Sequence, residues 1–283
     1  MDRLSYDINN IIFQFSDLTT IKNCKTINKY FEKICLKYLL QNYLFQFSFA
    51  MINEQKMYEK YKNITKLKVF NLHDILPFPN LKQLIFYNEF NQRIETPLPD
   101  KLTHITFGFK FNQQIKGILP NNLTHLILGH YFNQSIKDTL PESLTHLTFG
   151  YHFNQRIKDA LPEKLTHLTF GYNFDQPIKN ILPKSLTHLT FGCNFDQPIK
   201  GVLPEHLTHL TFSVYFNQLI RGALPRSLTH LTFGYNFDQQ IEYESLDNLQ
   251  ELSTSHTYRY IDDIPKNINI KHRYKSKSHI IIK

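Results

Sequence analysis

The sequence has little cysteine, no tryptophan and no long apolar run. Its only cysteines are Cys24, Cys35 and Cys193, none of them in a CxxC pair. Such a sparse, odd set argues against a disulfide framework and a thiolate zinc site. No stretch approaches 18 apolar residues, and the first ten residues lack an apolar core, so we expect neither a membrane span nor a signal peptide. The chain is therefore expected to be intracellular and cytoplasmic.

A charge excess is also missing from most of the chain. The formal net charge is +8, but residues 64–258 hold sixteen residues of each sign. The excess comes from residues 1–63, with nine basic against six acidic residues, and from residues 259–283, with seven against two. Nucleic-acid affinity needs many clustered cations, so the neutral centre argues against a nucleic-acid partner. A hydrophobic content of 41% excludes a mostly disordered chain.

A repeat of 21 residues dominates the sequence. A well-formed unit reads LPEKLTHLTFGYNFDQPIKNI, residues 161–181. Regular units occupy about residues 77–244, and the whole array runs over residues 63–258. Two markers recur at this step, a Leu-Pro pair that begins at Leu98 and ends at Leu224, and a Phe that begins at Phe90 and ends at Phe237.

The repeat predicts a parallel solenoid. Leu168 and Phe170 stand two residues apart, on one face of a short strand, as in a leucine-rich repeat. The roughly 15 residues left in each unit are too few for a helix of average length, so extended or 3₁₀ segments are expected outside. Gly171 is expected to supply freedom to turn, and Pro162 to open the next coil. A propeller is excluded because each blade needs about 40 residues.

Equivalent positions of successive units form columns, and the repeat alone assigns a role to four of them. Apolar positions represented by Leu165 and Phe174 form the core. The column from Phe90 to Phe237, which we name the Phe spine, is expected to stack edge against face. Asn and Asp exchange at the position that follows each spine Phe. Because an ionised Asp can only accept hydrogen bonds, the shared role is to accept them from turn N–H groups, and this role is favoured over calcium binding. That column comprises Asn91, Asn112, Asn133, Asn154, Asp175, Asp196, Asn217 and Asp238.

Histidine fills one column seven times, on the strand face opposite the core. A stacked surface ladder is favoured over metal ions held between neighbouring rings, because nothing supplies a closed tetrahedral ligand set. Since each added charge raises the cost of the next, the array should lose stability below about pH 6. The column comprises His104, His125, His146, His167, His188, His209 and His230.

A basic column is interpreted as a solvated outer edge. Its charge is offset in the sequence by Asp138, Asp159, Glu142, Glu163 and Glu205, which disfavours a phosphate-binding stripe. The column comprises Lys116, Lys137, Lys158, Lys179, Lys200 and Arg221.

Two adjacent columns vary between repeats and carry the candidate partner-binding residues. Aromatic side chains aligned at one rim are typical of interface hot spots, while variation by itself equally fits tolerance to substitution. Both interpretations stay open at this point. The candidates are Phe109, His130, Tyr131, Tyr151, His152, Tyr172, Tyr215 and Tyr235.

The units resemble the FNIP repeat, a short relative of the leucine-rich repeat. Its Phe-Asn-x-x-Ile core corresponds to residues 174–178, and the resemblance covers about residues 64–258. Long FNIP arrays are known chiefly from social amoebae and the giant viruses of amoebae, which would place a viral chain in the host cytoplasm. The resemblance implies a structural solenoid and no catalysis.

The first 62 residues differ from the array. Residues 4–45 resemble an F-box, the helical module that binds a Skp-type adaptor in ubiquitin ligases, although Ser5 and Asp7 depart from its opening motif. The alternative is a simple cap over the exposed end of the solenoid. The resemblance implies adaptor contacts at Leu4, Ile8, Ile12, Phe13, Leu18, Ile27 and Phe31.

These observations predict a leucine-rich-repeat-like parallel β-solenoid with a small α-helical N-terminal domain. Residues 259–283 are expected to form a C-terminal cap and basic tail. No catalytic motif or paired-carboxylate arrangement occurs, so we expect no enzyme, cofactor or small-molecule substrate. The expected function is protein–protein interaction, either as an F-box-type substrate receptor or as a scaffold with no link to ubiquitin.

Overall fold

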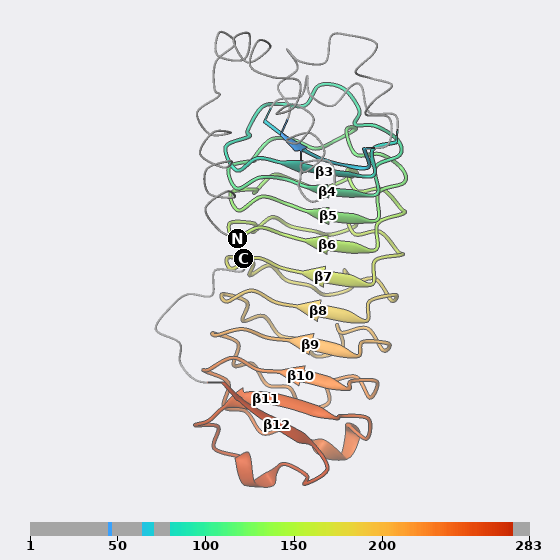
Figure 1. Cartoon of the computed structure of the whole chain (residues 1–283). Helices are drawn as coiled ribbons and strands as arrows, with labels where there is room; N and C mark the ends of the chain where they lie inside the picture. Colours follow the sequence, from blue (N-terminus) through green and yellow to red (C-terminus); the bar gives the residue numbers. More distant parts are fainter. Residues whose placement is uncertain (1–44, 47–63, 71–79, 274–283) are drawn as a thin grey trace, which may run out of the picture.

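The computed structural model describes residues 45–46, 64–70 and 80–273. These residues form one twelve-stranded parallel sheet, with the strands in chain order from β1 to β12. Successive strands stack along one axis, and each is followed by a loop that returns around the outside to begin the next strand (Figure 1). This is the parallel β-solenoid that the 21-residue period predicts.

The strands are short, and the outer path consists of turns and extended segments. The first three strands are β1 (Phe45–Gln46), β2 (Lys66–Val69) and β3 (Gln83–Phe86). Strands β4 to β10 are three residues long and lie at His104–Thr106, His125–Ile127, His146–Thr148, His167–Thr169, His188–Thr190, His209–Thr211 and His230–Thr232.

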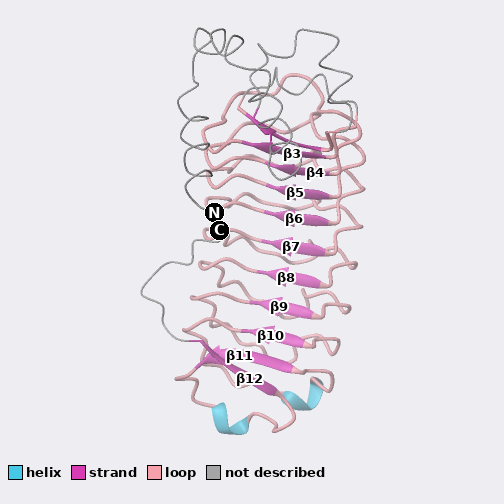
Figure 2. Ribbon diagram, viewed as in Figure 1, coloured by secondary structure: helices cyan, strands magenta, loops and turns pink. Residues whose placement is uncertain are grey.

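The sheet continues beyond the end of the regular repeats. Strands β11 (Glu251–Ser255) and β12 (Asn269–Arg273) pair in parallel, so the sheet runs past residue 258. Two 3₁₀ helices, η3 (Tyr243–Ser245) and η4 (Ile261–Asp263), lie in these last coils (Figure 2). The expected extended or 3₁₀ outer segments are therefore confirmed over the described coils.

Strand register converts each sequence column into a spatial column. His167 pairs with His188, and Leu168 with Leu189, in a register of 21 residues that holds from β4 to β10. The middle residue of each of these strands is buried while its two neighbours are partly exposed, except for the exposed Ile127. The placement of the histidine column opposite the core is thus confirmed.

The phenylalanine spine packs differently from our expectation. Rings of consecutive spine residues from Phe90 to Phe237 lie 5.9–6.3 Å apart, with planes inclined by only 6–14°. The edge-to-face prediction is wrong because each coil repeats the last by translation, which preserves ring orientation. A second column at the strand end packs against the spine, with Phe170 and Phe174 centred 3.8 Å apart.

The Asn/Asp column accepts hydrogen bonds from turn N–H groups, as predicted, and these bonds form a ladder from coil to coil. The Asn154 Oδ1 accepts the backbone N–H of Asp175 and the side-chain amide of Gln176, both at 3.0 Å. Asp175 in turn accepts from the backbone of Asp196 at 3.1 Å and from Gln197 at 2.8 Å. Because both side-chain types act as acceptors, amide and carboxylate exchange freely along the column. Arg259 ends the ladder by pairing with Asp238.

The glycine after each strand is required by close approach of neighbouring coils. A Cβ on Gly171 would lie 1.7 Å from the carbonyl oxygen of Gly150. Its φ is not positive, so the expectation that Gly171 supplies unusual turning freedom is wrong. Ser213 occupies the same column, and among the described residues its coil lacks the turn hydrogen bond that Phe174 N–H makes to Gly171 at 3.3 Å.

Replacing Gly171 by alanine should therefore destabilise the array. The added Cβ forces the turn open, as at Ser213, at an expected loss of about 2–3 kcal/mol. Gly201→Ala is the matched control, since nothing lies within 4 Å of its Cβ and only its positive φ is strained, at a cost of about 1 kcal/mol. Urea unfolding measures both, and equal losses would contradict the close-approach argument.

The predicted N-terminal domain lies outside the described residues. This applies to the F-box-like segment and to its helices, which stay predictions. The alternating phenylalanines at residues 45, 47 and 49 predict a strand. This is confirmed for two residues, because Phe45 and Gln46 pair with Leu67 and Lys68 of β2.

Candidate functional site: an aromatic rim and a histidine ladder

Each coil leaves the strand through a turn that carries two variable side chains. We name six of them, from four consecutive coils, the aromatic rim: Phe109, His130, Tyr131, Tyr151, His152 and Tyr172. Backbone hydrogen bonds between coils fix their spacing, as His152 N–H donates to the His130 carbonyl at 3.0 Å. The same bond recurs one coil earlier, from Tyr131 to Phe109 at 3.0 Å.

The six rings form one continuous network. In the first column, Phe109, His130, Tyr151 and Tyr172 stack with centroid separations of 4.2, 4.7 and 4.5 Å. In the second column, Tyr131 stacks on His152 at 5.0 Å. The columns meet edge to face, with Tyr131 perpendicular to Phe109 at 5.2 Å. Rings held on several sides lose little rotamer freedom on binding, which suits an interface.

The rim combines exposed aromatic rings with a buried polar nitrogen. Phe109 is 43% and Tyr131 45% exposed. The Nδ1 of His130 is buried and has no hydrogen-bond partner among the described residues. Burial, with His152 nearby, lowers the pKa of His130, and burial raises the pKa of Tyr172, with Tyr215 contributing. At neutral pH, therefore, His130 and Tyr172 are uncharged.

The two remaining rim candidates, Tyr215 and Tyr235, differ in their position relative to the aromatic rim. Tyr215 is 49% exposed and lies near enough to Tyr172 to contribute to the raised pKa of Tyr172. Tyr235 lies three coils beyond Tyr172 along the array, and its ring is tilted against His256 at 6.4 Å. The adaptor candidates from Leu4 to Phe31 lie outside the described residues.

The histidine ladder runs along the open face of the sheet. Rings of consecutive members are 4.1–4.2 Å apart, with planes within 8–13° of parallel. Each Nδ1 lies 2.9 Å from the hydroxyl of the preceding threonine, as in the pair Thr166 and His167. That hydroxyl also donates to the carbonyl of Thr145 at 3.1 Å. A hydroxyl has one proton, so a neutral histidine ring here donates its Nδ1–H to the hydroxyl and leaves Nε2 unprotonated.

This geometry disfavours binding of a metal ion between two neighbouring histidine rings. With Zn–N distances of about 2.0–2.1 Å, an ion between two rings whose centroids are 4.1 Å apart would have to lie almost in line with the two nitrogens. Lone pairs in parallel ring planes do not point toward one another, so the rings would have to leave the stack. Over the described ranges, no group of three or more His, Cys, Asp or Glu residues is arranged to hold a metal ion.

A comparison with models of known protein families shows to which family the chain belongs. The FNIP Repeat model matches residues 70–110, 111–152, 153–194, 174–215, 195–235 and 216–252. The chain belongs to the FNIP repeat family. The matches span well over half of the sequence and cover the aromatic rim and the histidine ladder together.

A solved structure supports the same architecture for this FNIP array. The crystal structure of the viral protein CroV588, described as a novel circular LRR protein structure, is 44% identical with a TM-score of 0.58. The alignment covers 69% of this chain and 34% of that one, so the chain spans about a third of the length of that protein. The comparison with curated proteins found no match.

Two exposed apolar features of the FNIP array were missed by the sequence interpretation. Val214 is 38% and Leu219 75% exposed, in the coil that contains Ser213. The signal was present, since Leu219 stands in a column that otherwise holds Arg, Gln, Ser or Pro. Ile127 is 45% exposed in a column that is otherwise threonine from β4 to β10. Within the described part, no helix is long and apolar enough to cross a membrane.

Proposed function

We propose that this FNIP protein is a non-enzymatic protein-interaction protein that binds a client along the aromatic rim. The observation that carries the proposal is the continuous network of six rings on four coils, two of them more than 40% exposed. Large aromatic side chains that are already ordered supply contact area at low entropic cost. A client protein should therefore contact Phe109 and Tyr131 first.

The arrangement of polar groups argues against catalysis. An active site needs a few unique residues that converge in a pocket. Here the polar columns repeat from coil to coil, and the ladder histidines stack with nearly parallel rings instead of converging on one point. The repeat solenoid fold is typical of non-enzymatic binding proteins. The proposal thus assigns no reaction to the protein.

The finer proposal is a substrate receptor for a ubiquitin ligase. Residues 4–31 would bind a Skp-type adaptor, and the rim would hold the client. It is supported by the F-box-like pattern, including Leu4, Ile8 and Asp17-Leu18. The alternative is a scaffold with no link to ubiquitin, in which the N-terminus only covers the end of the array.

Co-expression with a Skp-type adaptor, followed by size-exclusion chromatography, tests the two variants of this function. A stoichiometric complex that is lost on Ile8→Asp and Leu18→Asp is expected for the receptor. Separate elution of a well-folded chain would discard the receptor and leave the scaffold. A rim variant, Phe109→Ser with Tyr131→Ser, should keep the adaptor while losing the client, and Leu219→Ser is the matched exposed control.

A further inference from the structure

A column of tight turns with positive φ runs along the outer edge of the array. Each turn places a basic residue before a residue with φ between 56° and 75°. The N–H of the fourth turn residue donates to the carbonyl of the first at 2.9–3.4 Å, as in a type II β-turn. We name these the basic turns: Lys116–Gly117, Lys137–Asp138, Lys158–Asp159, Lys179–Asn180, Lys200–Gly201 and Arg221–Gly222.

The last basic turn binds a carboxylate of the chain itself. Glu242 stands one coil further along the same column as Arg221. Its Oε1 lies 2.8 Å from the Arg221 Nε, and its Oε2 accepts the backbone N–H of Gly222 at 3.2 Å. One carboxylate therefore bridges a cationic side chain and a turn N–H, so a turn of this geometry can hold a carboxylate.

The two preceding turns offer the same groups with no internal anion. Lys179 and Lys200 are exposed and form no ion pair among the described residues. The N–H groups of Asn180 and Gly201 likewise donate to no acceptor in the described part of the chain. Neither Asn180 nor Gly201 carries a negative charge that would repel an anion, so these two turns can bind carboxylates of another molecule.

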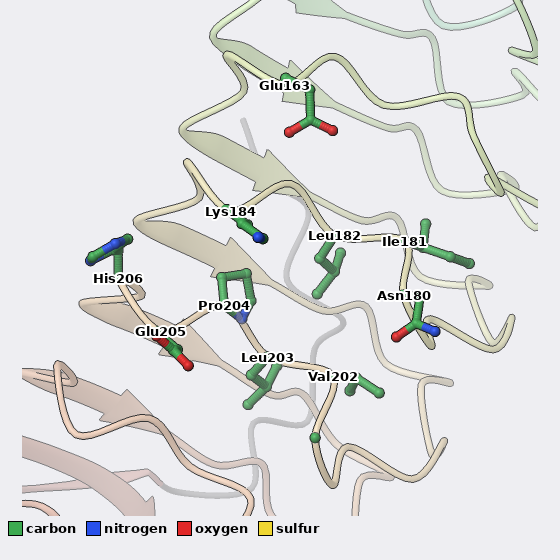
Figure 3. A pocket seen from close by; sticks show the side chains of 11 residues that line it. Glu163, Asn180, Ile181, Leu182, Lys184, Val202, Leu203, Pro204, Glu205 and His206 are labelled. Carbon is green, nitrogen blue, oxygen red and sulfur yellow. The ribbon is translucent and has the colours of Figure 1, made fainter.

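A cavity adjoins the same two turns. It has a volume of about 500 Å³ and lies between two successive coils, next to Asn180 and Gly201 (Figure 3). Partly buried aliphatic side chains line its middle, among them Ile181, Leu182 and Leu203. Its far end carries charges of both signs, from Glu163, Lys184 and Glu205. The cavity can therefore take one aliphatic side chain beside the two carboxylate positions.

We infer that the Lys179–Asn180 and Lys200–Gly201 turns, with this cavity, form a docking site for a short acidic–hydrophobic peptide of a partner protein. Two carboxylates of the peptide sit on the two turns as Glu242 sits on Arg221–Gly222, and the following aliphatic residue fills the cavity. This site is separate from the aromatic rim and adds a second recognition surface to the proposed function.

The chain supplies a matched control for the site. The Lys137–Asp138 and Lys158–Asp159 turns have the same geometry, with φ of 56° in both. Their third residues are aspartates, which repel an incoming carboxylate and partly cancel the lysine charge. The described cavity does not border either turn. A charge reversal in these two turns therefore changes net charge by the same amount without changing the docking site.

Fluorescence anisotropy with the full chain and the labelled peptide Ser-Glu-Glu-Leu-Leu-Ser-Ser tests the inference. Saturable binding is expected, and Lys179→Glu with Lys200→Glu should weaken it by at least about 10-fold. Lys137→Glu with Lys158→Glu should change it by less than about 3-fold, the size of a remote charge effect. Replacing both peptide Glu residues by Gln, or both Leu by Ser, should also weaken binding to the unmodified chain.

Three outcomes would overturn the site. They are absence of saturable binding at physiological ionic strength, equal loss in the two double variants, and equal affinity for the Leu-to-Ser peptide. Tight binding of an oligodeoxythymidylate with equal loss in both double variants would assign the lysine column to general polyanion attraction. The rim variant Phe109→Ser with Tyr131→Ser should leave peptide affinity unchanged, so failure of the rim proposal is measured separately.

Discussion

Truncation of one spine ring, Phe174→Ala, should lower the free energy of unfolding by about 3–5 kcal/mol. Phe174 is fully buried, packs on Phe170 at 3.8 Å, and is flanked by Phe153 and Phe195 at 6.2 and 6.3 Å. Removal leaves a cavity that the rigid coils on either side cannot close, since backbone hydrogen bonds fix their separation. Equilibrium urea unfolding measures the loss.

The repeat architecture also predicts how the protein unfolds after this change. Each coil contacts only its neighbours, so a weak central coil should uncouple the two halves of the array. We expect a broader transition and a lower m-value for Phe174→Ala. Phe109→Ala is the control, because Phe109 is 43% exposed and its loss should cost at most about 1 kcal/mol. A loss below about 1 kcal/mol at Phe174 would contradict the stacked-spine account.

Acidification from pH 7 to pH 4 should destabilise the protein through the histidine ladder. Burial, together with neighbouring histidines, lowers the pKa of His125 and His167 to about 4, and the pKa of His146, His188 and His209 is lowered for the same reason. In the unfolded chain these rings titrate near 6.5. Below that pH the unfolded chain binds protons that the folded chain does not, so stability falls as pH falls, and the loss is complete only near pH 4.

The size of this effect is set by partial solvent screening of the ladder. At about 0.5 kcal/mol per ring for five rings, the loss is about 2–3 kcal/mol, or roughly 5–10 °C in Tm. Replacing alternate rings, His125→Gln, His167→Gln and His209→Gln, should remove much of the pH dependence. Glutamine suits the column because Gln83 already occupies it in β3.

An exposed histidine outside the ladder provides the control for the pH experiment. His206 is exposed, and His206→Gln should leave the pH dependence of Tm unchanged. Carboxylates also titrate near pH 4, so the difference between the triple variant and the unmodified chain is the quantity that measures the ladder. An unchanged Tm between pH 7.5 and 5.5 in the unmodified chain would remove the claim.

The sequence by itself determined the repeat, the strand positions and the role of the main columns. Identical residues at a fixed step must occupy equivalent places, so the core leucines, the outward histidines and the accepting Asn/Asp column followed from periodicity. The exchange of Asn154 for Asp175 at equivalent positions was enough to identify a hydrogen-bond acceptor, and the structure confirms the ladder.

The sequence showed that aromatic residues would line one rim, but not which would touch. Stacking between Tyr131 and His152, and the separation of Tyr235 from the other rings, depend on side-chain rotamers and on how each turn closes. The same is true of Tyr215, whose exposed position goes with the open turn at Ser213. A variable column carries no repeated signal from which such contacts could be read.

Distances between coils were decided only by the tertiary structure. The parallel stacking of the Phe spine, the 1.7 Å approach that requires glycine at Gly171, and the proton position on each ladder histidine all depend on how one coil lies on the next. The carboxylate of Glu242 on the Arg221–Gly222 turn belongs to the same class. A one-dimensional pattern specifies which residues are equivalent, whereas packing forces between translated coils set their separation and orientation.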